Sequence, residues 1–358
     1  MSETETMPAK KPRLRKIVSG LIGFSIVAPV AAAALWPSSY LIEKPGPVFN
    51  VLASSNGLPI IKVTGKESFP TEGELDLLTI TFGQSAPNRA SWLEVAMSYL
   101  DPSLARVDYE SIYPPNVDSS QVKQQAEVMM LDSQANAKAA ALNLLGIPYT
   151  TDVKVTAVTK NAPATGKLLA GDTVLTVNGE KATGLEQVRS VVEASQGKTP
   201  VVFDILRNGS HRTISILPKL SDGKWRVGIY VASVPEFPFK IDILLQSVSG
   251  PSGGQIFALA IYDKLTPGSL TGGNKIAGTG TVDASGNIGA IGGIKPKMYG
   301  AVRAGAKYFL APSVNCGDVV GNVPDGLQVI KVSNLKDSLN ALKAIREGNQ
   351  ASLPTCTK

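Results

Sequence analysis

The chain has 358 residues, 43% of them hydrophobic and 18% charged, which is enough to bury the cores of two or three domains and excludes a largely disordered protein. Its formal net charge is +6, and much of that excess lies in five Lys and Arg residues between positions 10 and 16. Because no basic stripe is interleaved with aromatic residues, we expect no nucleic-acid partner. One histidine and two cysteines without metal-ligand spacing also predict no metal or other cofactor.

Residues 17–36 contain no charged side chain. A helix of this length spans about 30 Å, the thickness of a hydrocarbon core. The basic residues of the tail, 1–16, come directly before it, so the positive-inside rule predicts a cytoplasmic N-terminus and a single-pass signal anchor in the cell membrane, with the rest of the chain outside the cytoplasm. The alternative is a signal peptide cleaved near Ala33, and both interpretations imply export.

The next part of the chain, residues 37–145, is expected to pack on a C-terminal catalytic domain. Strands are predicted at residues 59–63 and 75–82. A long helix is predicted to begin after Asp118 or Ser119 and to run to about Leu145, where Gly146 ends it as a C′ glycine.

A different pattern follows from residue 153, with predicted strands and one short amphipathic helix over residues 185–194. The strands at 201–206 and 213–217 are joined through Asn208-Gly209, which is a strong hairpin signal. The stretch NAPATGKLLAGDTVLTVNGEKATGLEQV, residues 161–188, resembles bacterial PDZ domains, with their Pro-Ala turn, Gly-Asp strand start and Asn-Gly turn.

This resemblance implies an inserted PDZ domain over residues 146–220, whose groove takes an extended peptide as an added strand. Val188 is expected to line the groove. Leu145, Gly146 and Ile147 are candidates for the loop whose amides hold a terminal carboxylate. The alternative for Gly146 is a plain helix cap.

The loop Gly250-Pro251-Ser252-Gly253-Gly254 precedes a predicted buried helix that runs to about Leu265. At such a helix start, free amides and the positive end of the helix dipole would stabilise an oxyanion formed beside Ser252. The flanking glycines would let a substrate backbone approach. Taken alone, the loop is equally typical of a capping serine, and a phosphate cradle is a third interpretation.

A nucleophilic serine needs a base. The single histidine, His211, lies by the predicted hairpin turn and is expected in solvent, so a serine–lysine pair is the remaining common arrangement. Lys295 is the candidate, expected at the N-cap of a helix that begins with Pro296 and ends at Gly305. Desolvation would have to lower its pKa from about 10.4. Lys297 is expected to be an ordinary surface lysine.

These residues carry a second resemblance. Gly250-Pro251-Ser252 and GTGTVDASGNIGAIGGIKPKMYGAVRAGAKYFLAPSVN, residues 278–315, resemble the proteolytic domain of the Lon protease family. The resemblance implies Ser252 as nucleophile and Lys295, 43 residues further on, as base, with Thr279 beside them. Two positions depart from the family pattern, because Gly253 stands where Lon usually has alanine and Thr281 where an acidic residue is common.

The expected fold is an α/β Lon-type proteolytic domain over residues 221–358, with the inserted PDZ domain and an N-terminal transmembrane helix. The chain contains no Gly-x-x-x-x-Gly-Lys-Ser/Thr loop, so no ATP is expected. This arrangement is similar to the exported, ATP-independent Lon-like PDZ proteases of bacteria. It implies a serine endopeptidase acting on membrane-proximal or unstructured polypeptides. A non-catalytic PDZ adaptor at the membrane is the alternative, and self-association stays open.

Cys316 and Cys356 are the two cysteines. In an exported protein they can form a disulfide that closes a loop of about 40 residues. The alternative is two separate thiols.

Overall fold

The computed structural model describes residues 33–55, 57–83, 89–245 and 248–357. Residues 1–32 hold the predicted basic tail and most of the predicted transmembrane helix, and they lie outside this range. Among the helices that are described, none is both long and apolar enough to cross a membrane.

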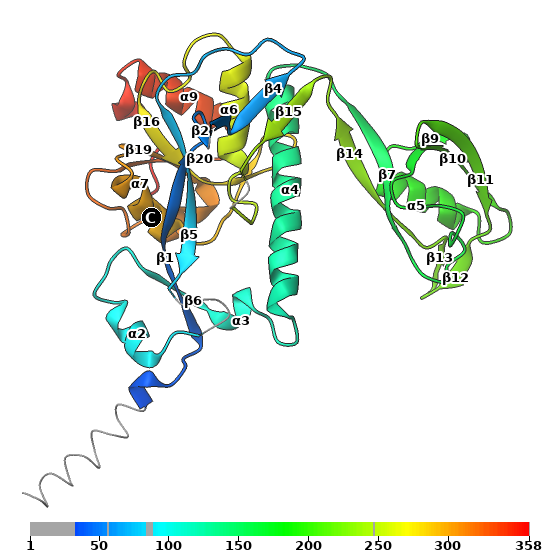
Figure 1. The fold of residues 1–358 in the computed structure, drawn as a ribbon, viewed down its shortest axis with the longest axis horizontal. Coiled ribbons are helices and arrows are strands. Elements are labelled where there is room, and N and C mark those ends of the chain that lie inside the picture. The colour runs from blue at the N-terminus through cyan, green and yellow to red at the C-terminus, as the bar shows by residue number, and fades with distance from the viewer. Residues whose placement is uncertain (1–32, 56, 84–88, 246–247, 358) are drawn as a thin grey trace, which may run out of the picture. The chain divides into compact units, whose positions relative to one another are not determined.

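The chain divides into two compact units, which are described separately below (Figure 1). The first consists of Met1–Ile61, Phe69–Ala137 and Ile243–Lys358, and the second of Lys62–Ser68 and Lys138–Asp242. Most of the second unit is therefore an insertion in the first, and residues 37–137 fall almost entirely within the unit that holds Ser252.

A six-stranded sheet organises the first unit, in the order β20-β19-β16-β5-β1-β6. The strands β5, β16, β19 and β20 are parallel neighbours, and β1 is antiparallel to both β5 and β6. The strands have the bounds β1 Tyr40–Asn50, β5 Glu74–Phe82, β6 Ala105–Asp108, β16 Lys275–Gly278, β19 Tyr308–Pro312 and β20 Gln328–Val332.

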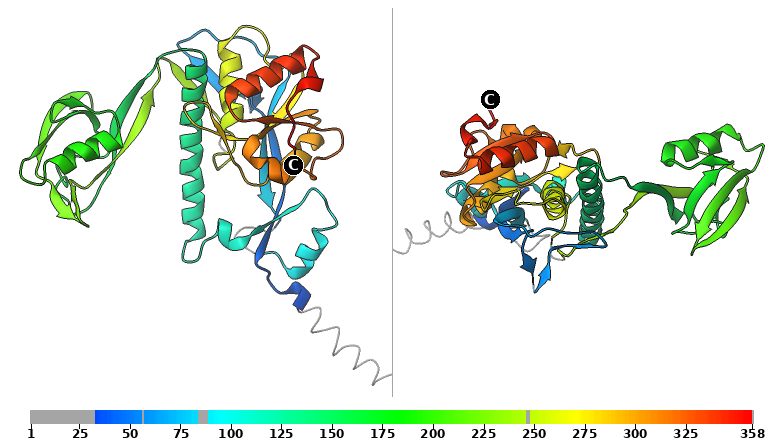
Figure 2. Two further views of the ribbon diagram at one scale, coloured as in Figure 1. Left: turned by 180° about the vertical axis from the view of Figure 1, so that it is seen from behind. Right: turned by 90° about the horizontal axis from the view of Figure 1, so that it is seen from above.

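Helices cover both faces of this sheet (Figures 1 and 2). Successive residues of β5 point to opposite faces. Leu77 faces the start of α6, while Leu78 belongs to the core beneath α7. The helices of this unit are α2 Trp92–Met97, α3 Tyr109–Ile112, α4 Ser119–Leu144, α6 Gly254–Leu265, α7 Ile294–Arg303, α8 Cys316–Val319 and α9 Leu335–Arg346, with 3₁₀ turns η1 Ser313–Asn315 and η2 Gln350–Ser352.

Short strand pairs complete the first unit and its edge. They are β2 Ser54–Ser55 with β3 Leu58–Pro59, β4 Ile61–Thr64 with β15 Lys240–Ile243, and β17 Thr281–Val282 with β18 Ile288–Gly289. Asn334 caps α9, because its side chain accepts a hydrogen bond from the amide of Asp337 at 3.0 Å. Cys316 and Cys356 are joined by a disulfide, with Cα atoms 5.1 Å apart.

The second unit is a sheet in the order β11-β10-β8-β7-β14, packed against helix α5, Leu185–Ala194. Its strands are β7 Thr150–Val158, β8 Thr173–Val177, β9 Glu180–Lys181, β10 Val201–Arg207, β11 Ser210–Ile216, β12 Lys219–Ser221, β13 Lys224–Arg226 and β14 Ile229–Glu236. Because β14 pairs with β7 from Ile229 to Glu236, this unit continues past the predicted boundary at Leu220. The sequence analysis did not include these residues because β14 and β7, which pair with each other, lie far apart in the sequence.

Helix α4 ends in the structure where the sequence predicted its end, at Gly146. Gly146 has a φ of 66°, and the amide of Ile147 donates to the carbonyl of Leu142 at 2.9 Å, which is the hydrogen bond of a Schellman cap. Leu145, Gly146 and Ile147 therefore serve as the end of a helix, the alternative that the sequence left open for Gly146.

Candidate functional site

Ser252 lies immediately before α6, but it does not cap that helix, since the N-cap residue is Gly253. The Ser252 carbonyl accepts hydrogen bonds from the amide of Gly280 at 2.9 Å and from the hydroxyl of Thr279 at 3.1 Å. Across the described residues, the Ser252 hydroxyl itself has no hydrogen-bond partner. The loop thus holds the backbone of Ser252 firmly and leaves its oxygen free to react.

The start of α6 can also stabilise a negative charge. Its first turn contains no acidic residue, and the amides of Ser252 and Gly253 have no acceptor within the described part of the chain. Unpaired amides at the positive end of a helix stabilise a developing oxyanion.

The two glycines expected to support the loop have different surroundings. Gly250 has a φ of 85°, a conformation that favours glycine, and open space lies where a Cβ would be. A Cβ on Gly253 would instead lie 2.5 Å from Cδ1 of Leu77. Gly253 therefore faces the core, and packing against Leu77 accounts for glycine where Lon proteases usually have alanine. This is not the predicted role of admitting a substrate backbone.

Helix α7 begins at Ile294, earlier than the sequence predicted, because Gly293 adopts the left-handed conformation with a φ of 66° and becomes the N-cap. Lys295 is consequently the second helical residue and Lys297 the fourth. At 3.6 residues per turn, two positions separate side chains by about 200°, so the two lysines point to opposite sides of the helix.

The buried lysine is Lys297, with 2% of its surface exposed, whereas Lys295 is half-buried. The Lys297 Nζ donates to the hydroxyl oxygen of Thr279 at 3.1 Å, and the same hydroxyl donates to the carbonyl of Ser252. The structure therefore brings Ser252, Thr279 and Lys297 together, not Lys295.

Lys295 lies on the other side, near Asp101. Two hydrogen bonds from Ser103 hold the pKa of that carboxyl below its usual range, and the charges of Arg303 and Lys295 lower it further. The outward position of Lys295 is the expected consequence of the earlier helix start.

Burial lowers the pKa of Lys297 to about 8, against the opposing effect of Glu43, whose negative charge raises it. Glu43 is itself buried on β1, and desolvation raises its pKa, while Lys297 acts in the opposite direction. At neutral pH a pKa of about 8 leaves roughly a tenth of the Lys297 side chains uncharged. Lys297 can therefore accept a proton. The sequence analysis did not single out Glu43. The one signal that the sequence offers for it is a lone carboxylate in an apolar strand.

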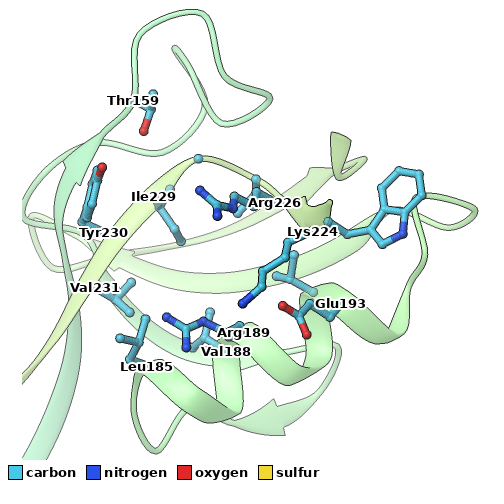
Figure 3. Close-up of a pocket in the computed structure, with 14 residues that line it drawn as sticks. Thr159, Leu185, Val188, Arg189, Glu193, Lys224, Arg226, Ile229, Tyr230 and Val231 are labelled. Atoms are coloured by element: carbon cyan, nitrogen blue, oxygen red, sulfur yellow. The ribbon is translucent and has the colours of Figure 1, made fainter. Parts of the chain in front are cut away.

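The second unit contains a cavity of about 330 Å³ between α5 and β14 (Figure 3). Val188 and Val192 of α5 line it, and Leu185, Arg189 and Tyr230 are also among its lining residues. Its strand is β14, the edge strand of the sheet, whereas β7 lies inside the sheet between β8 and β14. Residues 145–147 do not line it.

No group of three or more His, Cys, Asp or Glu residues within the described ranges is arranged to hold a metal ion.

Comparison with known proteins identifies both domains. Residues 247–344 match the model of the Lon protease (S16) C-terminal proteolytic domain, and residues 117–217 match that of the PDZ domain. The expected resemblance to Lon-like PDZ proteases is thereby confirmed at the level of the domains, and the proteolytic domain supports a serine peptidase.

Curated relatives match over part of the chain. The Lon protease of Rhizobium meliloti is 35% identical over 24% of this chain and 11% of its own length, and that of Clostridioides difficile is 28% identical over 49% and 23%. A Lactococcus lactis protein named as a zinc metalloprotease is 38% identical over 24% of this chain and 19% of its own. The chain thus spans less than a quarter of the length of each of these relatives.

Proposed function

We propose that this chain, which joins a PDZ domain to a Lon-type proteolytic domain, is a serine endopeptidase with Ser252 as nucleophile and Lys297 as general base. The observation that carries the proposal is the hydrogen-bonded series from Lys297 through Thr279 to the backbone of Ser252. Lys297 takes the place of Lys295, the base implied by the sequence, because only the inward-facing lysine is desolvated.

In the proposed mechanism, uncharged Lys297 accepts the proton of the Ser252 hydroxyl as its oxygen attacks the peptide carbonyl. Amides at the start of α6 stabilise the oxyanion of the tetrahedral intermediate. Lys297 returns the proton to the departing amine, and an acyl group stays on Ser252. Water, deprotonated by Lys297, then hydrolyses the acyl-enzyme and restores both residues.

We further propose that the enzyme works without ATP outside the cytoplasm, anchored in the membrane by residues 17–36. The sequence supports this through its uncharged run behind a basic tail and the lack of a nucleotide-binding loop in the chain. Its substrates would be unstructured or membrane-proximal polypeptides, because nothing in the proposed cycle unfolds a stable protein.

The test of the nucleophile is covalent labelling. Incubation with a peptidyl phosphonate ester should inactivate casein cleavage and leave one adduct, which mass spectrometry assigns to Ser252. Ser252→Ala should give no adduct and no cleavage. Ser249→Ala, an exposed serine of the same loop, is the control and should label and cleave normally. A wild-type chain that neither labels nor cleaves would favour the non-catalytic adaptor instead.

The cavity between α5 and β14 supports a second proposal, that the PDZ groove holds an extended peptide along the free edge of β14. Leu185→Glu, on the exposed wall, should lower kcat/KM for casein by roughly tenfold if the groove concentrates substrate at the site, and should spare a short fluorogenic peptide. If the groove gates access, both rates change together. Leu169→Glu, equally exposed in the same unit but outside the cavity, is the matched control. Unchanged rates in a folded Leu185→Glu variant would contradict both roles.

A further inference from the structure

A set of large apolar side chains is exposed on α2 and on the residues around it. Figure 1 shows where α2 lies in the ribbon. We call this set of side chains the α2 patch. Its members are 47% to 76% exposed and are Trp36, Trp92, Leu93, Met97, Tyr99 and Leu100. Single exposed apolar residues are ordinary, but six of them on one short helix and its neighbouring residues, two of them tryptophans, indicate an interaction surface.

Five of the six residues of α2 are apolar. Val95 is its buried residue and packs with Ile42 and Ala90, while Leu93 and Met97, one turn apart, point away from that core. The one charged residue between positions 91 and 100 is Glu94, which is engaged in a capping box with Ser91. The first unit therefore covers the Val95 side of α2, while the apolar side of Leu93 and Met97 stays exposed.

The patch is tied to the end of the uncharged run at residues 17–36. The amide of Trp92 donates to the carbonyl of Trp36 at 3.2 Å, and Pro37 forms a β-bridge with Ser91. The rings of Tyr40 and Trp92 are in edge contact, with centroids 6.4 Å apart. Wherever Trp36 lies with respect to a bilayer, α2 must therefore lie at nearly the same depth.

We propose that the α2 patch inserts into the outer interfacial layer of the membrane, with lipid as its partner. The inference rests on the proposed anchoring through residues 17–36, which brings Trp36 to the bilayer surface. Tryptophan and tyrosine rings settle at that depth, and an apolar helix lying in the interface buries its exposed face among acyl chains. The Arg106 guanidinium, 3.7 Å from the centre of the Tyr99 ring, can pair with lipid phosphates beside the patch.

The chain has three tryptophans, Trp36, Trp92 and Trp225, so fluorescence can test each position separately. Full-length single-tryptophan variants, made by Trp→Phe at the other two positions, are reconstituted into phosphatidylcholine vesicles with or without brominated acyl chains. Trp92 should lose as much emission to the brominated lipid as Trp36 does. Trp225, in the second unit, is the control and should keep its emission.

In the Trp92-only protein, Leu93→Gln with Met97→Gln should abolish the quenching. Leu217→Gln with Leu220→Gln, two exposed leucines of the second unit, should not change it. Quenching of Trp36 without Trp92 overturns the α2 proposal and leaves the anchor standing. Quenching of Trp92 without Trp36 contradicts both the anchor and the common depth of Trp36 and α2 on which the proposal rests. If neither tryptophan is quenched, both the anchor and the α2 proposal fail. A Trp92 side chain that is then shielded from water by protein alone would assign the patch to a second copy of the chain.

Discussion

Replacing Lys297 with methionine should reduce proteolysis by roughly 10²–10⁴-fold or more, the usual contribution of a general base. Methionine fills a similar volume and cannot accept a proton. Lys297→Arg should be equally inactive, because a guanidinium stays charged at any working pH. The measurement is kcat/KM on a fluorogenic peptide.

The matched control is Lys295→Met, two residues away on the opposite side of the same helix. It should keep nearly full activity, because Lys295 faces Asp101 and not Thr279. The reverse pattern, an active Lys297→Met and an inactive Lys295→Met, would return the role to Lys295. Urea unfolding guards against a loss of activity through unfolding, because Lys297→Met removes one partner of a buried pair and leaves the Glu43 carboxyl without its counter-charge.

The pH dependence of kcat/KM should reflect the pKa of Lys297, which burial lowers. Only the uncharged amine can act as base, and its pKa is lowered to about 8. Activity should therefore rise by about tenfold per pH unit below pH 8 and level off above it. A profile that is flat between pH 6 and 9 would contradict a lysine base with this environment.

Replacing Glu43 with glutamine should move the midpoint of the pH profile in a known direction. The negative charge of Glu43 raises the pKa of Lys297, so its removal should lower that pKa and move the midpoint of the profile to lower pH. Asp101→Asn removes a carboxylate that interacts with Lys295 and should leave the midpoint where it was. A midpoint that moves upward in Glu43→Gln, or that moves equally in both variants, would refute this electrostatic account.

Local signals in the sequence were sufficient for several features. Gly146 ends α4 where predicted, because a cap is decided by a few adjacent residues. The loop around Ser252 and the helix after it were likewise predicted from a run of glycines followed by a run of apolar residues. The two domain types followed from motifs of the same local kind.

The choice between Lys295 and Lys297 could not be made in this way. It depends on the residue at which α7 begins, and the left-handed Gly293 moves that start from Pro296 to Ile294. Both lysines then lie in the first turn, about 200° apart, and the packing of α7 on the rest of the unit decides which of them is buried.

Tertiary contacts decided the remaining features. Glu43 reaches the surroundings of Lys297 from a strand early in the chain, and β14 becomes the wall of the PDZ groove by pairing with β7. The sequence by itself determined which residues can be nucleophile, cap or turn, since those properties reside in a few neighbouring residues. Only the folded structure determined which lysine loses its water, because desolvation depends on groups that are distant in the sequence and adjacent in space.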